Sequence, residues 1–247
     1  MNDLSIIFNF MNPYRHRISQ IQQTIKTANL TSPHPETPVH LLAVSKTKSS
    51  SDISLAYQLG LRHFGESYLQ EALSKQKSLA HFAITWHFIG PIQSNKTRAI
   101  ANNFSWVHSV DRLKIAKRLN EQRSLSLPPL NIYLQINISG EASKSGITLE
   151  QLPALIVEIK QFKNLSLRGV MAIPEKHIGY EAQCQPYREI YQTIQKLEDP
   201  TLSHFSFGMS GDIEAAIHEG ATIVRVGTAL FGQRARYSEQ KKTDQLI

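Results

Sequence analysis

Short apolar runs of strand character alternate with amphipathic helical segments along most of the 247-residue chain, and this alternation constrains the fold most strongly. Each run precedes a helical pattern or a helix start, and the eight runs span 39–44, 62–65, 85–89, 105–110, 131–138, 166–172, 203–208 and 222–226. Eight strand–helix units predict a closed parallel (β/α)8 barrel, an α/β fold of the TIM type. An open doubly wound sheet is the alternative, although no Gly-x-Gly-x-x-Gly motif follows the first run.

No linker or change in composition divides the chain into two folding units. We therefore expect residues 1–30 to form an extra N-terminal helix packed on the barrel, residues 31–233 to form the barrel, and residues 234–247 to form a basic tail. The apolar run 6–10 is interrupted by Asn9 and preceded by Asp3, so it is predicted to begin a helix rather than to act as a signal segment.

The composition argues against several classes of protein. Hydrophobic residues make up 41% of the chain and no long apolar stretch occurs, so we expect no membrane association. The net charge is +7, but the basic residues are spread along the chain between acidic residues and no recognition motif accompanies them. We therefore expect no nucleic-acid partner. The single cysteine, Cys184, excludes an internal disulfide framework and fits a reducing compartment, which predicts a cytoplasmic location.

Lys46 lies at the C-terminal tip of the first predicted strand, which is the end where barrel enzymes place their chemistry. Side chains alternate along a strand, so Leu42, Val44 and Lys46 share the inward face. A lysine that is partly shielded from water there has the free amine that a Schiff base with an aldehyde requires. The alternative is a solvated lysine just beyond a strand.

Two glycine-containing turns follow the last two predicted strands. Ser210 and Gly211 follow the seventh strand, and Gly227 and Thr228 follow the eighth. Barrels of this kind commonly bind a phosphate group at these two loops. Together with the lysine, the turns indicate a site for an aldehyde that carries a phosphate, which points to pyridoxal 5'-phosphate (PLP). Ser210 also fits a simpler role as the N-cap of the following helix.

Arg225 and His87 are both expected to point into the barrel. Arg225 shares a strand face with Gly227, and beside a pyridine nitrogen it would make that nitrogen an acceptor, because arginine does not give up its proton. A buried ion pair is the alternative for Arg225. His87 shares a face with Ile89, and a hydrogen-bonded position in the core is favoured over a catalytic role.

The fifth predicted strand has an apolar face suited to packing on helices and a polar inward row, which consists of Asn131, Tyr133, Gln135 and Asn137. A polar inward row is unusual in a purely structural barrel and suggests a site near the C-terminal ends of the strands. Paired cysteines and a His-x-x-x-His spacing are absent from the sequence, so no metal site is expected.

Motifs from about residue 39 to residue 232 resemble, in order, those of the pyridoxal phosphate homeostasis protein family. They are AVSKTK at 43–48, FGESY at 64–68, WHFIG at 86–90, QSNK at 93–96, SKSG at 143–146, LRGVMAIP at 167–174, FGMS at 207–210 and VRVGTALFG at 224–232. The resemblance implies a fold-type III barrel, like the N-terminal domain of bacterial alanine racemase, that holds PLP as an internal aldimine.

The resemblance also assigns roles to individual residues of this chain. Lys46 matches the Schiff-base lysine, and Arg225 matches the residue at the pyridine nitrogen. The phosphate ligands of the family match Ser210, Gly227 and Thr228.

Further candidate cofactor contacts are Gly211, His87, Asn137, Met171 and Ser67. The family pattern usually has asparagine where this chain has Ser67, and the shorter serine side chain weakens the case for a direct contact at that position.

The function implied by the resemblance is PLP homeostasis, meaning storage, buffering or delivery of the cofactor without catalytic turnover. Racemisation needs an acid and a base on opposite faces of the substrate, and racemases of this fold draw the second group from an additional domain and a partner subunit. This chain ends soon after its eighth predicted strand, so Lys46 has no evident opposite-face partner. An amino-acid racemase and a lysine-dependent aldolase are the alternatives.

Expected partners are PLP, other B6 vitamers and the apo forms of PLP-dependent enzymes. We expect the chain to act as a monomer.

Overall fold

The structure is a computed structural model that describes residues 3–140 and 145–233, with side chains from residue 13 onward. Eight parallel strands form a closed barrel in which each strand pairs with its neighbours in the sequence and β1 pairs with β8. The strands are β1 (His40–Val44), β2 (His63–Glu66), β3 (Thr85–Phe88), β4 (Trp106–Val110), β5 (Leu130–Ile136), β6 (Leu165–Ala172), β7 (His204–Ser206) and β8 (Ile223–Val226). The predicted barrel is confirmed, and the open sheet is excluded because β1 and β8 close the ring.

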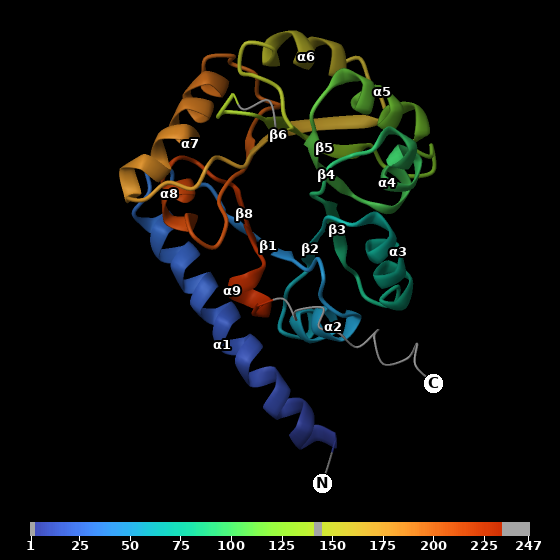
Figure 1. The fold of residues 1–247 in the computed structure, drawn as a ribbon, viewed down its shortest axis with the longest axis vertical. Coiled ribbons are helices and arrows are strands. Elements are labelled where there is room, and N and C mark those ends of the chain that lie inside the picture. The colour runs from blue at the N-terminus through green and yellow to red at the C-terminus, as the bar shows by residue number, and fades with distance from the viewer. Residues whose placement is uncertain (1–2, 141–144, 234–247) are drawn as a thin grey trace, which may run out of the picture.

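Helices form an outer ring around the strands (Figure 1). They are α1 (Asp3–Leu30), α2 (Ser50–Gln58), α3 (Leu69–Ser78), the 3-10 turn η1 (Ser94–Lys96), α4 (Thr97–Asn103), α5 (Leu113–Gln122), α6 (Leu152–Ile159), α7 (Tyr180–Gln195), α8 (Ile213–His218) and α9 (Thr228–Phe231). None of the helices in the described ranges is both long enough and apolar enough to cross a membrane.

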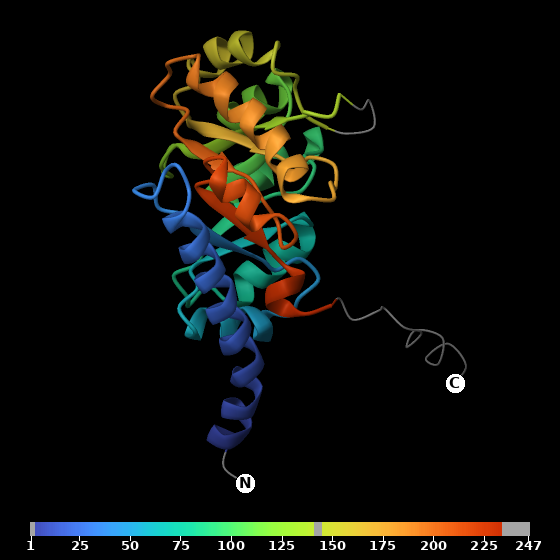
Figure 2. The same cartoon turned by 90° about the vertical axis from the view of Figure 1, so that its left-hand side faces the viewer.

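The N-terminal helix α1 lies against α8 and α9 on the outside of the barrel (Figures 1 and 2). Its buried face carries Ile18, Ile21 and Ile25, which recur at the spacing of helical turns. The hydroxyl of Tyr14 donates a hydrogen bond of 2.6 Å to Asp52 in α2. The predicted extra helix is therefore confirmed. The division of the chain at residues 30 and 233 stays a prediction, and the tail at 234–247 lies outside the described residues.

All eight predicted runs contain a strand, although several ends differ. The strand shortened most is β7, which covers three residues of the predicted run 203–208. Gly208 has a left-handed φ of 79°, and a Cβ there would lie 2.6 Å from Cβ of Ala216. The chain therefore leaves the sheet before Gly208 and turns toward α8.

The side chains of the strands sort into two apolar layers as the alternation predicts. The outer layer packs between the strands and the helices and includes Ile132 and Leu134 of β5. A smaller inner cluster consists of Leu42, Tyr133, Met171 and Ile223, with Ile89 and Trp106 packed against it. The inner cluster occupies part of the barrel interior together with buried polar side chains, and the cavity that could take a ligand lies at the C-terminal ends of the strands.

Candidate functional site

A cavity of about 640 Å³ opens at the C-terminal ends of the strands. Eight of the ten predicted cofactor contacts line it: Lys46, Ser67, Met171, Ser210, Gly211, Arg225, Gly227 and Thr228. These residues come from the ends of β1, β2, β6, β7 and β8 and the loops that follow them. The structure therefore brings the lysine, the arginine and both glycine turns to one cavity.

Lys46 follows β1 by two residues, and the residue before it is held firmly in the barrel wall. Ser45 is buried; its amide donates to the carbonyl of Gly65, and its hydroxyl donates a 2.6 Å hydrogen bond to Oε1 of Glu66. Lys75 of α3 donates both to the Ser45 carbonyl, at 2.8 Å, and to Oε1 of Glu66, at 2.7 Å. Burial raises the pKa of Glu66, although Lys75 opposes the rise.

The residue after Lys46 is held by the same helix. The amide of Thr47 donates a 2.6 Å hydrogen bond to Oε1 of Glu71, and Lys75 lies 2.5 Å from that oxygen. Thr47 has a φ of 65°, which is uncommon for a residue that is not glycine. The Glu71–Lys75 pair of α3 thus fixes the backbone on both sides of Lys46.

Lys48 shares the strand parity of Lys46 and is the nearest other lysine in the sequence. Its ammonium donates to three carbonyl oxygens at the end of α9, those of Phe231, Gly232 and Gln233, at 3.0 to 3.3 Å. Lysine at a helix C-terminus satisfies carbonyls that lack partners within the helix. Lys48 therefore ties the strand end to α9, while Lys46 lines the cavity.

Arg225 of β8 is buried and lines the cavity. Its Nη1 donates to the carbonyl of Ser206 and, at 2.7 Å, to the hydroxyl of the same residue, while Nη2 donates at 2.9 Å to the carbonyl of Ala172. All of these acceptors are neutral oxygens, so the ion pair considered from the sequence is not what holds the side chain. Burial lowers the pKa of Arg225, but an arginine so bonded still carries its proton.

The first glycine turn is shaped by Asp212. Its Oδ1 accepts from the amide of Met209 at 2.6 Å, and the Asp212 amide donates to the Met209 carbonyl. This turn leaves Ser210 and Gly211 at the cavity wall. The alternative role of Ser210 as the N-cap of the following helix is excluded, because α8 begins at Ile213 with Asp212 in the N-cap position.

The second glycine turn lies beside β1. Gly227 precedes α9, and a Cβ at this position would lie 3.3 Å from the carbonyl oxygen of Val44. A larger residue would push the turn away from the strand that carries Lys46. Thr228 begins the helix, so its amide has no acceptor within α9, and the residue lines the cavity.

Two predicted contacts, His87 and Asn137, are not among the residues that line the cavity. His87 is buried inside the barrel, where its Nδ1 lies 2.9 Å from Nε2 of His108 and its Nε2 lies 3.0 Å from Nδ1 of His63. The favoured role as a hydrogen-bonded core histidine is confirmed. Inward parity placed His87 correctly, but it cannot distinguish the depth of the barrel from its mouth.

Tyr187 and Asp212 line the cavity although the sequence analysis assigned them no role in a site. The hydroxyl of Tyr187 donates a 2.7 Å hydrogen bond to Oδ2 of Asp212 and accepts one from the Gly208 amide. Burial and the Asp212 carboxylate raise the pKa of Tyr187. No sequence signal marks Tyr187, because its contact with the turn depends on how α7 packs against α8.

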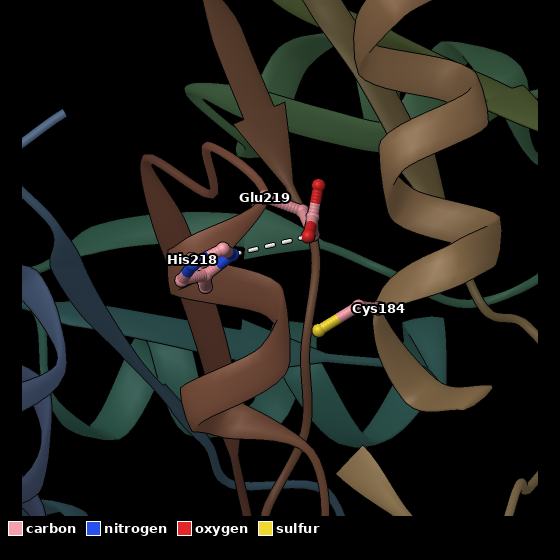
Figure 3. A group of neighbouring side chains, drawn as sticks. All are labelled: Cys184, His218 and Glu219. Atoms are coloured by element: carbon pink, nitrogen blue, oxygen red, sulfur yellow. Dashed lines mark hydrogen bonds and ion pairs between the residues drawn. The ribbon is translucent and has the colours of Figure 1, made fainter. Parts of the chain in front are cut away.

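A cluster of potential metal ligands lies away from the cavity, where Cys184 of α7 faces His218 and Glu219 at the end of α8 (Figure 3). The Glu219 carboxylate already pairs with Arg188 at 2.8 Å and lies 3.1 Å from Nδ1 of His218. Burial raises the pKa of the Cys184 thiol. To bind here, a metal ion would have to displace the guanidinium of Arg188 and deprotonate the Cys184 thiol. The absence of a metal site stays a prediction.

The chain is similar to known proteins over most of its length. The alanine racemase N-terminal domain family matches residues 16–235. A pyridoxal phosphate homeostasis protein of Pseudomonas aeruginosa is 54% identical over 224 residues, which cover 91% of this chain and 97% of that protein. The protein of the same name from Escherichia coli K12 is 45% identical over 229 residues, which cover 91% of this chain and 98% of that protein. The chain belongs to the pyridoxal phosphate homeostasis protein family.

Solved structures agree with this assignment. PipY of Synechococcus elongatus, solved with PLP bound, is 32% identical with a TM-score of 0.77, and the match covers 89% of this chain and all of PipY. Alanine racemase of Corynebacterium glutamicum has a TM-score of 0.63 at 15% identity and is covered over 63% of its length. At that identity the likeness to the racemase concerns the fold alone.

Proposed function

We propose that this protein binds PLP in the cavity and attaches it covalently through Lys46. The proposal rests on one observation: Lys46, whose flanking backbone is fixed by α3, the buried Arg225 and two glycine turns all line one cavity of suitable volume. PipY, a relative of similar length and fold, has been solved with PLP bound, which supports the same ligand here.

The residues present fit the chemical groups of PLP. Lys46 supplies the amine for the aldehyde, and the turns at Ser210–Gly211 and Gly227–Thr228 supply backbone and hydroxyl donors for the phosphate. Arg225 adds a buried positive charge to a cavity that would receive an anion. Because α8 and α9 are only six and four residues long, individual donors matter here more than helix dipoles.

Arg225 also determines how the pyridine nitrogen would be held. A guanidinium has only donors, so a nitrogen facing it accepts a hydrogen bond and stays unprotonated. Bound PLP supplies an electron sink for carbanions, and the sink is weaker when this nitrogen carries no proton. Tyr187 cannot easily act as a base, because its hydroxyl donates to Asp212 and its pKa is raised.

This arrangement favours holding and releasing PLP over catalytic turnover, and we infer that the protein stores, buffers or delivers the cofactor. The names of the relatives support this inference. Binding of other B6 vitamers, delivery to apo enzymes, a monomeric state and a cytoplasmic location stay predictions.

Titration of the PLP-free protein with PLP tests the proposal. We expect the parent protein to bind one equivalent, and Lys46→Arg, which keeps the charge but cannot attach the aldehyde, to bind at least about tenfold more weakly. The matched control is Lys77→Arg, at an exposed position on α3. A parent protein that binds no PLP, or a Lys46→Arg variant that binds as tightly as the control, would overturn the proposal.

A further inference from the structure

A continuous row of hydrogen-bonded side chains crosses the barrel interior from the cavity toward the opposite end. It links Nη1 of Arg225 to the hydroxyl of Ser206 at 2.7 Å, that hydroxyl to Nδ1 of His108 at 2.8 Å, Nε2 of His108 to Nδ1 of His87 at 2.9 Å, and Nε2 of His87 to Nδ1 of His63 at 3.0 Å. The five residues come from β8, β7, β4, β3 and β2. His63 shares a surface recess at the N-terminal ends of the strands with His40 and Arg62.

The interior part of this row is shielded from water. Ser206, His108 and His87 are buried. The indole of Trp106 stacks on His87 with ring centres 5.6 Å apart, and the ring of Tyr133 lies 4.4 Å from that of His108. Each ring nitrogen of His108 and His87 therefore depends on its neighbour in the row for a hydrogen-bond partner.

Arg225 dictates the direction of the bonds. A guanidinium can only donate, so the Ser206 oxygen accepts from it. A buried positive charge repels the hydroxyl proton of Ser206, which is therefore directed away from Arg225 and toward Nδ1 of His108. His108 must then carry its own proton on Nε2.

The proton direction continues along the row. His108 donates from Nε2 to Nδ1 of His87, so His87 also carries its proton on Nε2 and donates to Nδ1 of His63. Burial lowers the pKa values of His87 and His108 well below the ordinary histidine value, and these two residues are therefore neutral. One proton arrangement is thus consistent from the cavity to His63.

We propose that His108 is a positioning residue for Arg225: it fixes the Ser206 hydroxyl so that the serine oxygen faces the guanidinium, as the near end of a hydrogen-bonded row with a single proton direction. The contacts with Ser206 and Ala172 then fix the plane of the guanidinium at the cavity. The effect on ligand binding rests on the proposed function, in which Arg225 faces the pyridine nitrogen. The direction of the row does not rest on it.

Nuclear magnetic resonance of the PLP-free protein, with ¹⁵N-labelled histidine, tests the direction. The nitrogen shifts distinguish protonated from unprotonated ring positions, and the signals are assigned with His87→Gln and His108→Asn. We expect His108 and His87 to be neutral at pH 7.5, with the proton on Nε2. A proton on Nδ1 of either residue, or on both nitrogens of one ring, would overturn the proposal whatever the protein binds.

Two substitutions of His108 test the positioning role. In His108→Asn the side-chain oxygen can occupy the place of Nδ1, two bonds from Cβ, and still accept from Ser206, whereas His108→Leu removes the acceptor. We expect His108→Asn to bind PLP within about threefold of the parent and His108→Leu to bind at least about tenfold more weakly with a shifted absorption maximum. His81→Asn, at an exposed position, is the control.

The outcomes separate this proposal from the proposed function. If the parent binds PLP and a folded His108→Leu binds it equally well, or if both variants are equally impaired, the positioning role is wrong. If the parent binds no PLP, the proposed function fails and the tautomer measurement alone decides the row. If His108→Leu does not fold, the test uses His108→Asn and the histidine tautomers of the parent protein. PLP binding by His108→Asn within about threefold of the parent, with the protons on Nε2, supports the proposal, and failure of either result contradicts it.

Discussion

The ammonium of Lys75 donates a 2.8 Å hydrogen bond to the carbonyl oxygen of Ser45, the residue immediately before Lys46. Lys75 also pairs with the buried Glu66 and with Glu71, whose carboxylate accepts from the amide on the other side of Lys46. Helix α3, outside the barrel, therefore fixes the backbone on both sides of Lys46, which lines the cavity. Ordering this segment before a ligand arrives reduces the entropy lost on binding.

Replacement of Lys75 is expected to destabilise the fold. Lys75→Met keeps the length of the side chain but leaves Glu66 buried without its cation, so we expect the free energy of unfolding to fall by about 3 kcal/mol. The double variant Lys75→Met, Glu66→Gln should recover part of the loss, because the unpaired carboxylate is gone. Urea denaturation measures both, with the exposed Lys77→Met as the control. Equal stability of the Lys75 and Lys77 variants would contradict this account.

Stability is expected to fall in mild acid because of the buried histidines. The folded-state pKa values of His87 and His108 are well below the ordinary value of 6.5, so their contribution is fully present above pH 6.5 and is lost as the pH falls toward their folded pKa values. Each contributes a slope of up to about 1.4 kcal/mol per pH unit once the unfolded chain is protonated.

Urea denaturation between pH 7.5 and pH 5.0 measures this slope. Above pH 6.5, His87 and His108 should add no pH dependence to the free energy of unfolding. His108→Asn should reduce the slope, and the exposed His81→Asn should leave it unchanged. A stability that rises on acidification from pH 6.5 to 5.5 would show that the interior histidines are not neutral.

Much of the fold and of the site follows from the sequence because both depend on period and position. The alternation of runs predicts the barrel, and strand parity places Lys46 and Arg225 on the inward face at the correct end. Motif position likewise brings both glycine turns to the cavity. These features are local, so one sequence is sufficient to predict them.

Other features depend on contacts between distant segments, which parity and motifs do not specify. The depth of His87 follows from its pairing with His63 and His108 across three strands. The helix after β7 begins at Ile213 rather than at Ser210, because Asp212 bonds back to Met209. Tyr187 reaches the site only through the packing of α7.

Ser210 is expected to contribute modestly to phosphate binding. Ser210→Ala removes one hydroxyl donor and leaves the backbone, so PLP affinity should fall by about 1 to 2 kcal/mol. Ser210→Asp places a negative charge beside the phosphate and should weaken binding by more than about a hundredfold. Equilibrium titration measures both, with the exposed Ser203→Ala as the control. If Ser210→Asp binds as tightly as the parent, the phosphate lies elsewhere.

Transfer of PLP is expected to exceed catalysis. The PLP-loaded protein, mixed with the apo form of a PLP-dependent enzyme, should restore the activity of that enzyme. Alone, in deuterated water, it should exchange the α-proton of added amino acids far more slowly than about 1 per second, because Arg225, if it faces the pyridine nitrogen as proposed, would weaken the electron sink. Exchange at or above that rate would place the protein among the enzymes.

The site of covalent attachment is the most direct test of the central claim. The PLP-loaded parent protein is reduced with borohydride, which makes the lysine linkage permanent, and is then digested and mapped by mass spectrometry. The account predicts one pyridoxyl phosphate group per chain, located on Lys46 in the peptide that follows β1. A group found instead on any other lysine, including Lys176, which also lines the cavity, would contradict it.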